Sequence, residues 1–317
     1  MHKFEDIELF VSELFPNAKN IALLGKGGHS HAYSFDEEGQ KLVIRFSRHS
    51  EDFEKDLFAN RFDSVAIPVP KLIKIGDAFG GYFAISEQRD GLMFDDLDTD
   101  QIRRTLPSIF KLLDGLREAD ISDTVGFGAF DVNGVGGSAT WSEHLLDSLE
   151  DNPTKRTHGW YKILQESKYG TKLFDDGLAV FKNLTGSLPN VRHLIYYDLL
   201  NRNVLVNDNE ITAVFDWGCG RYGDFLFELA CFTFWSPIID GYRDFDWKTL
   251  ARNHFESNGT QVSNFEIRLM TYELFIGLEH LGYNAFIGGW ENYEKTQDLV
   301  TKILENIRTY HNSITIQ

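Results

Sequence analysis

The chain has 317 residues, of which 42% are hydrophobic and 25% are charged, as in an ordinary globular protein and unlike a disordered or fibrous one. Its formal net charge of -17 argues against nucleic acid and anionic membrane surfaces as partners, because phosphate groups are bound through clusters of Lys and Arg. The acidic surplus is compatible with a cationic small-molecule ligand, and equally with simple solubility.

The two cysteines, Cys219 and Cys231, are too few for a disulfide framework or a zinc cluster, and their apolar surroundings predict buried thiols. The first six residues contain no apolar signal core, and no apolar run reaches membrane-spanning length. We therefore expect a cytoplasmic protein.

The predicted elements begin with a small β-rich lobe. Apolar residues at helical spacing predict a short helix over 7–15, and a second helix is expected over 52–62, before the prolines of 67–70. Five segments with β character complete this part, and they are residues 21–24, 31–35, 42–46, 71–75 and 81–87. A five-stranded sheet with one inserted helix is the expected result.

Beyond residue 99 the pattern becomes helical. Long helices are predicted over 101–116 and 175–184, and again from 226 to the end. Three β segments interrupt them, at residues 193–197, 203–206 and 211–215, and the last two should form a hairpin across 207–209. Residues 124–138 contain five glycines and predict a long structured loop.

These elements predict an α+β fold with two lobes. The N-terminal β lobe should comprise residues 1–89, with a hinge over 86–90, and the larger helical lobe residues 90–317.

One constellation suits phosphoryl transfer. Asp198 is followed five residues later by Asn203, and the predicted hairpin should return Asp216 towards Asn203. The reaction needs a carboxylate to accept or orient the acceptor hydroxyl, and oxygen ligands for a Mg²⁺ that bridges the nucleotide phosphates. Asp198 would be the base, and Asn203 and Asp216 the metal ligands. The alternative is that all three are ordinary turn residues.

Residues 191–235 resemble the aminoglycoside phosphotransferase family, which has a protein-kinase-like fold, and most closely its hygromycin B phosphotransferases. The motifs that carry the resemblance are 126–130 with 134–136, Thr140-Trp141, 191–194, 211–217, 222–224, 228–230 and Phe234-Trp235. The resemblance extends forward to Phe10 and fades after about Pro237. One departure is Tyr196, where the family usually has a scaffold histidine; the base and both metal positions match.

The β lobe carries a candidate nucleotide loop, because glycines let backbone N–H groups approach phosphate and a hydroxyl can add a contact. The residues concerned are Gly25, Gly27, Gly28 and Ser30, and the alternative is a plain hairpin turn. Arg45 occupies the strand position where kinases place a phosphate-binding lysine. Its acidic partner should come from the next helix, with Asp56 the first choice and Glu54 the second.

The resemblance also implies a hinge at Ser86, Glu87, Gln88 and Arg89, whose backbone would meet the adenine edge. Candidate apolar walls of the nucleotide site are Ile44, Ile73 and Ile85, each of which could equally be plain core. Asp224 is expected to support the catalytic loop.

An amino-bearing acceptor would need carboxylates in a partly desolvated cleft. The candidate acceptor-binding residues are Glu228, Trp235, Asp240 and Glu273, with Asp244 and Glu279 nearby in the sequence of the C-terminal helices. Each acid taken singly could instead lie on a solvated face.

The predicted function is ATP- or GTP-dependent, Mg²⁺-dependent O-phosphorylation of an aminoglycoside, with a hygromycin B-like acceptor. One alternative is a metabolic small-molecule kinase for choline, a sugar or an amino alcohol. Another, suggested by Tyr196, is a catalytically silent kinase-like nucleotide-binding protein.

Overall fold

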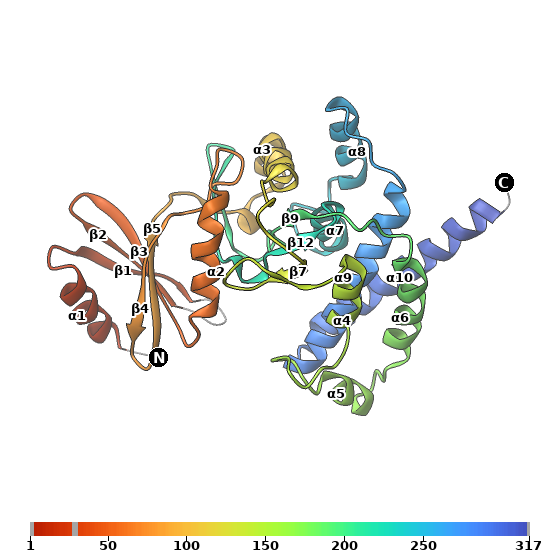
Figure 1. The fold of residues 1–317 in the computed structure, drawn as a ribbon, viewed down its shortest axis with the longest axis horizontal. Helices are drawn as coiled ribbons and strands as arrows, with labels where there is room; N and C mark the ends of the chain where they lie inside the picture. Colours follow the sequence, from red (N-terminus) through yellow and green to blue (C-terminus); the bar gives the residue numbers. More distant parts are fainter. Residues whose placement is uncertain (1–2, 27–30, 316–317) are drawn as a thin grey trace. The chain divides into compact units, whose positions relative to one another are not determined.

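A computed structural model describes residues 3–26 and 31–315 of the chain (Figure 1). The chain divides into two compact units. Unit 1 consists of Met1–Asp96, Asp131–Gly134 and Asp198–Gly220, and unit 2 consists of Leu97–Phe130, Val135–Tyr197 and Arg221–Gln317.

Unit 1 is built on a five-stranded antiparallel sheet with the strand order β1-β2-β3-β5-β4, as the sequence predicted. Its strands are β1 (Lys19–Lys26), β2 (His31–Glu37), β3 (Gln40–Ser47), β4 (Leu72–Ala78) and β5 (Gly81–Glu87). Helix α1 (Phe4–Leu14) covers one face, and α2 (Glu51–Ala59), which continues into the 3-10 turn η1 (Asn60–Phe62), lies on the other (Figure 1).

Side-chain alternation along β3 and β5 decides what each face of this sheet does. Ile44 and Ile85 are opposite each other in the register and are buried together with Ile7 of α1. Because successive side chains of a strand point to opposite faces, Arg45 and its partner Ala84 lie on the α2 face. The prediction that Ile44 and Ile85 form a wall of the nucleotide site is therefore wrong, and Ile73 is exposed instead.

The predicted hairpin is present and belongs to unit 1. Strands β10 (Val204–Asn207) and β11 (Glu210–Val214) pair across a turn in which Asp208 and Asn209 both have positive φ, the conformation that tight hairpins favour. The short strand β6 (Leu92–Met93) adds to β10, giving the order β11-β10-β6. This pairing is why the hairpin groups with the β-rich unit, whereas the predicted division at residue 89 assigned it to the helical lobe.

Two further 3-10 turns belong to unit 1: η2 (Phe94–Asp96) directly follows β6, and η3 (Trp217–Cys219) follows β11.

Unit 2 is mainly helical, as predicted. Its helices are α3 (Thr99–Glu118), α4 (Trp141–Ser148), α5 (Trp160–Glu166), α6 (Lys172–Thr185), α7 (Leu226–Trp235), α8 (Trp247–Ser257), α9 (Phe265–Ile287) and α10 (Trp290–Thr315), with a 3-10 turn η4 (Ser236–Ile238). Helix α9 is buried over most of its length, because α5, α6, α7 and α10 pack around it. Helices α4 and α5 are short and were not predicted.

The glycine-rich segment 124–138 is not a loop throughout. It contains strands β7 (Phe127–Phe130) and β8 (Gly136–Ser138), which join β12 (Arg221–Gly223) and β9 (His193–Ile195) in a sheet ordered β8-β7-β12-β9. Glycine is what allows the close pairing, since a Cβ on Gly126 would lie 2.1 Å from the carbonyl oxygen of Gly136.

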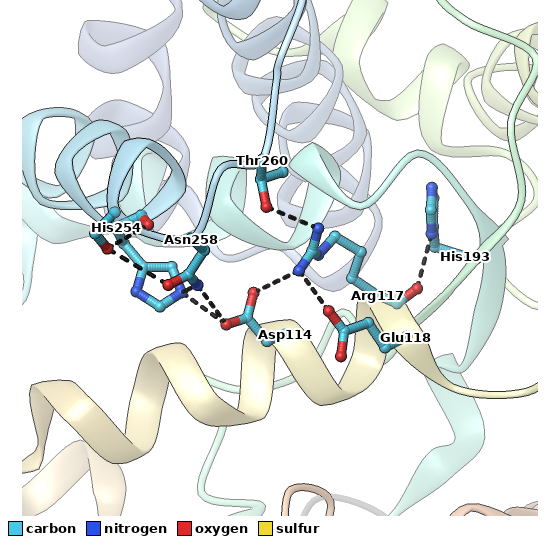
Figure 2. A network of polar contacts seen from close by, with 8 residues as sticks. Asp114, Arg117, Glu118, His193, His254, Asn258 and Thr260 are labelled. Carbon is cyan, nitrogen blue, oxygen red and sulfur yellow. Dashed lines mark hydrogen bonds and ion pairs between the residues drawn. The ribbon is translucent and has the colours of Figure 1, made fainter.

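A polar network joins α3 to α8 within unit 2 (Figure 2). His254 Nε2 lies 2.7 Å from Asp114 Oδ2, and Arg117 donates to Asp114 Oδ1 at 3.0 Å and to Thr260 Oγ1 at 3.1 Å. The ring of His254 also stacks on Phe110. These contacts fix the two helices to each other.

None of the helices among the described residues combines the length and the apolar character that crossing a membrane requires. Both cysteines are free thiols; Cys231 is buried, as predicted, and Cys219 is half-buried.

Candidate functional site

The predicted pairing of Arg45 with an acid from α2 is confirmed for Asp56. The guanidinium of Arg45 forms an ion pair with Asp56 Oδ2, and both side chains are largely buried, at 14% and 8% exposure. The ring of Phe53, one turn earlier on α2, lies 5.2 Å from the guanidinium carbon of Arg45. Packing and charge together hold Arg45 in one direction.

A cavity of about 310 Å³ opens in unit 1 beside this ion pair. Its lining includes the predicted nucleotide-binding residues Gly25, Arg45, Asp56, Ser86, Glu87 and Gln88. Its apolar wall comes from residues that sequence reasoning missed, among them Ala32, Val43, Val69, Leu72, Ala213 and Phe215. Gly27, Gly28 and Ser30 lie outside the described residues.

The end of β5 gives the cavity a backbone edge. Glu87 N donates to Lys71 O and Gln88 N donates to Lys41 O, each at 3.0 Å, so that the chain on both sides holds the segment predicted as the hinge. Beyond it, Arg89 pairs with Glu87 at 3.0 Å on the surface.

Asp198 and Asn203 are in direct contact. Asn203 Nδ2 donates to Asp198 Oδ2 at 2.7 Å, and Asn201 Nδ2 donates to Asp198 Oδ1 at 3.0 Å. The second amide was not predicted. Two amide donors therefore fix the orientation of the Asp198 carboxylate, and the same contact leaves the side-chain oxygen of Asn203, Oδ1, as the atom that suits a cation.

The hairpin brings Asp216 back to Asn203, as predicted, since Phe215 N donates to Asn203 O at 3.1 Å. Asp216 has a left-handed backbone, with φ of 63°, and begins the turn η3. Helix α2 holds this turn at two points: Asp56 Oδ1 accepts from Trp217 N at 2.6 Å, and Lys55 Nζ donates to Gly218 O at 3.3 Å.

Asp56 thus bonds to Arg45 with one oxygen and to the residue after Asp216 with the other. A second carboxylate of α2 is also close, because a Cβ on Gly218 would lie 3.5 Å from Asp216 Oδ1 and 3.7 Å from Asp52 Oδ1. Sequence reasoning missed both Lys55 and Asp52. For Asp52 the available signal was its position four residues before Asp56 on one helix.

The electrostatics of Asp216 fit a divalent cation. Burial raises the pKa of its carboxyl, and the charges of Asp56 and Asp52 raise this pKa further, while Arg45 opposes them. A buried carboxylate beside like charges is stabilised by a bound cation. One carboxylate and one amide oxygen are ligand types that Mg²⁺ takes, with phosphate and water oxygens completing its shell.

The turn that follows Asp198 is fixed by contacts that the sequence did not indicate. Arg202 has φ of 59°; its backbone N–H donates to Asp95 Oδ2 at 2.8 Å, and its guanidinium makes two bonds to Asp96, at 2.7 and 2.9 Å. Burial raises the pKa of Asp95.

In unit 2, buried acids support the approach to this segment. Glu228 accepts from the backbone N–H of Tyr196 at 2.8 Å and from that of Tyr197 at 3.0 Å, and Tyr196 itself is fully buried. Asp224 is also fully buried; it pairs with Arg268 and accepts from the hydroxyl of Tyr272 at 2.6 Å. A supporting role for Asp224 agrees with this geometry.

The four candidate acceptor-binding residues are not brought together. Glu228 is engaged with the backbone, and Glu273, equally buried, pairs with Lys248 at 2.9 Å. Asp240 is exposed and pairs with Arg243, and the half-buried Trp235 packs edge-on against His280. The burial of the two glutamates argues against direct contact with an acceptor.

The chain is similar to proteins of known activity over most of its length. It is 29% identical to the hygromycin-B 4-O-kinase of Escherichia coli over 285 residues, which cover 89% of this chain and 80% of the relative.

The solved structures agree. The aminoglycoside phosphotransferase APH(4)-Ia superposes with a TM-score of 0.85 at 27% identity, covering 96% of this chain and 99% of the other. A thermostable mutant of that protein, in ternary complex with AMP-PNP and hygromycin B, gives a TM-score of 0.82 at 27% identity, covering 95% and 98%. The predicted kinase-like α+β fold is thereby confirmed.

The model of the phosphotransferase enzyme family matches residues 20–250, which include β1 to β5, the Arg45–Asp56 pair and the segment that carries Asp198, Asn203 and Asp216. The chain belongs to the phosphotransferase enzyme family.

Proposed function

We propose that the protein transfers the γ-phosphoryl group of ATP or GTP to a hydroxyl group of an aminoglycoside of the hygromycin B type. The observation that carries this proposal is the similarity, over nearly the whole chain, to a hygromycin-B 4-O-kinase and to a structure that holds a nucleotide analogue with hygromycin B. The contact between Asp198 and Asn203, and the ion pair between Arg45 and Asp56, supply matching chemistry.

Asp198 is proposed to orient the acceptor hydroxyl and to take its proton as the bond to phosphorus forms. The amides of Asn203 and Asn201 hold its carboxylate in one orientation before substrate arrives. Because the transition state of phosphoryl transfer is loose, this positioning matters more than the strength of the base.

Arg45 is proposed to bind the α- and β-phosphates. Its link to Asp56 limits the side-chain freedom that would otherwise be lost on binding, and the planar guanidinium matches the geometry of phosphate oxygens. Asn203 and Asp216 would hold Mg²⁺, which when bound neutralises charge on the β- and γ-phosphates.

The tyrosine at 196 is compatible with activity. Its ring is fully buried and its backbone N–H is held by Glu228, so it acts as scaffold, as the usual histidine does.

The experiment is a Mg²⁺-dependent transfer assay from ATP and from GTP to hygromycin B, other aminoglycosides, choline and amino sugars. Transfer to hygromycin B supports the proposal. Transfer only to a metabolite would keep the mechanism and replace the acceptor, and nucleotide binding without transfer to any acceptor would favour the catalytically silent alternative.

We predict that Asp198→Ala keeps nucleotide affinity within about twofold while turnover falls by ~1000-fold, because the lost carboxylate serves the acceptor and not the nucleotide. Equilibrium nucleotide binding and steady-state kinetics measure the two effects. Turnover at the wild-type rate would remove Asp198 from the proposed mechanism.

A further inference from the structure

The segment 198–220 carries Asp198, Asn203 and Asp216, and it is a single excursion of the chain from unit 2 into unit 1. The residue before it is Tyr197 and the residue after it is Arg221. Strand β9 leads into the excursion and β12 leads out, and the two strands pair antiparallel, with Ile195 opposite Arg221.

Tyr197 holds a conformation that non-glycine residues rarely adopt, with φ of 71°. Three sets of contacts within unit 2 hold Tyr197 in this conformation. Its N–H donates to both carboxylate oxygens of Glu228, at 3.0 and 3.2 Å, and its hydroxyl donates to Glu279 Oε2. Burial raises the pKa of the Tyr197 phenol well above its usual value, so the phenol stays a donor throughout the working pH range.

The third contact joins the two ends of the excursion. The guanidinium carbon of Arg221 lies 4.0 Å from the centre of the Tyr197 ring, and Arg221 is itself buried. Phe227 packs beside both, with its ring centre 4.9 Å from that of Tyr197 and 5.6 Å from the guanidinium carbon. A cation against an aromatic face is strongest when both are removed from water, as here.

We propose that Tyr197 and Arg221 form a clip that closes the base of the 198–220 excursion and thereby fixes the backbone from which Asp198 projects. Both are positioning residues, acting on Asp198 through the single peptide unit that follows Tyr197. Closing a loop at its ends restricts every residue within it, so the clip also limits the freedom of the turn that carries Asn201 and Asn203.

Glu279 completes the clip from α9, and Glu228 completes it from α7. This assigns a use to Glu279, which the sequence had placed among possible acceptor contacts. The carboxylate that accepts from the phenol anchors the entry of the excursion, so its loss should act through loop order rather than through affinity for a cationic ligand.

The test combines hydrogen-exchange mass spectrometry of peptides within 198–220 with kinetics of phosphate transfer. In Tyr197→Leu and Arg221→Met we expect about tenfold faster exchange in these peptides, because local opening becomes easier. We expect kcat to fall about 100-fold, as for a misplacement of roughly 1 Å. The nucleotide affinity should fall less than kcat, by under about tenfold, because the part of the excursion that lines the cavity is also held by α2 through the bond from Trp217 N to Asp56.

Arg117→Met is the matched control. Arg117 in the network of Figure 2 is also largely buried, pairs with Asp114 and lies 5.8 Å from the ring of Phe225, but its side chain joins α3 to Thr260, beyond the end of α8. This variant should lower the Tm and leave both the exchange of 198–220 and kcat unchanged. Tyr197→Phe keeps the ring and loses only the bond to Glu279, so it should fold even if Tyr197→Leu fails to fold, and its exchange and kcat should lie between those of wild type and Arg221→Met.

The kinetic readout rests on the proposed function, and the exchange readout does not. If wild-type protein transfers phosphate to no acceptor, the proposed function fails and the exchange comparison still decides the clip. The clip would be overturned if Arg221→Met and Tyr197→Phe exchanged within 198–220 at the wild-type rate while their Tm was lowered as much as that of Arg117→Met.

Discussion

At the scale of single residues, the periodicities of strand and helix decide which side chains face the cavity of unit 1. Arg45 faces the cavity, so alternation along β3 makes Val43 face it too and makes Ile44 face the core. A cavity that contains Arg45 therefore cannot also have Ile44 as one of its walls. On α2, Asp56 stands three residues after the buried Phe53 and therefore shares its face, whereas Glu54 is turned about 100° away. Left-handed backbones at Tyr197 and Asp216 carry no such signal, because glycine, their usual marker, is absent at both positions.

Asp216→Asn should stabilise the ligand-free protein at neutral pH while abolishing turnover. The pKa of Asp216 is raised in the folded state, so the fold favours the protonated carboxyl. The stability gained from this preference is fully present below the unfolded pKa near 4 and is lost as pH rises through the raised pKa. Asparagine removes the buried charge, and we expect the Tm at pH 7 to rise by about 2 °C. Differential scanning calorimetry at pH 7 and pH 4 measures this; a variant less stable than wild type at pH 7 would contradict it.

At the scale of elements, long and strongly periodic segments were predicted well and short, glycine-rich ones were not. The helices α3 and α6 and the β10–β11 hairpin have clear patterns of their own. The strands β7, β8 and β12 have three or four residues each, and they exist because four segments from distant parts of the sequence pair in one sheet. No local pattern can indicate such a sheet, since its stability lies in pairing between segments.

Gly128→Ala should destabilise the protein by ~2 kcal/mol or more. Gly128 in β7 has φ of 80°, and a Cβ there would stand 2.1 Å from His144 Nδ1, whose ring stacks against the buried Trp141 and cannot easily move. Gly137→Ala is the control, because a Cβ at that position meets no atom within 4 Å. Urea unfolding of both variants checks the prediction, and equal midpoints would refute it.

At the scale of the whole molecule, the division of the chain was the feature least accessible to sequence reasoning. A boundary at the hinge describes where the first sheet ends, but β6, of only two residues, recruits the β10–β11 hairpin into the same unit. The proposed base and metal ligands therefore share unit 1 with the cavity, while Glu228 and Glu279 belong to unit 2. Composition and charge carry no information on this division.

Acid should unfold the protein partly through His144. Burial, together with the nearby charges of Arg221 and Lys155, lowers the pKa of His144 to about 3. Below about pH 6.5 His144 is protonated in the unfolded chain but stays neutral in the folded chain. The free energy of unfolding therefore decreases as pH falls from 6.5 towards 3. The loss should reach about 1–2 kcal/mol at pH 5.

His144→Gln should flatten this part of the pH profile, because glutamine takes up no proton in either state. Thermal unfolding of wild type and variant between pH 5 and pH 8 makes the comparison. Parallel profiles over that range would assign the acid sensitivity to other groups.

The composition of unit 1 from three separate stretches has a consequence for synthesis on the ribosome. The five-stranded sheet is complete once Glu87 has emerged. Strand β6 cannot pair until β10 has been synthesised, and the cavity is incomplete until Phe215 and Trp217 have been added. At ~5–20 residues per second, that wait is on the order of ten seconds. During that interval the nascent β lobe has an unpaired strand and an open apolar wall, so the chain is most exposed to chaperones and proteases before its cavity is complete.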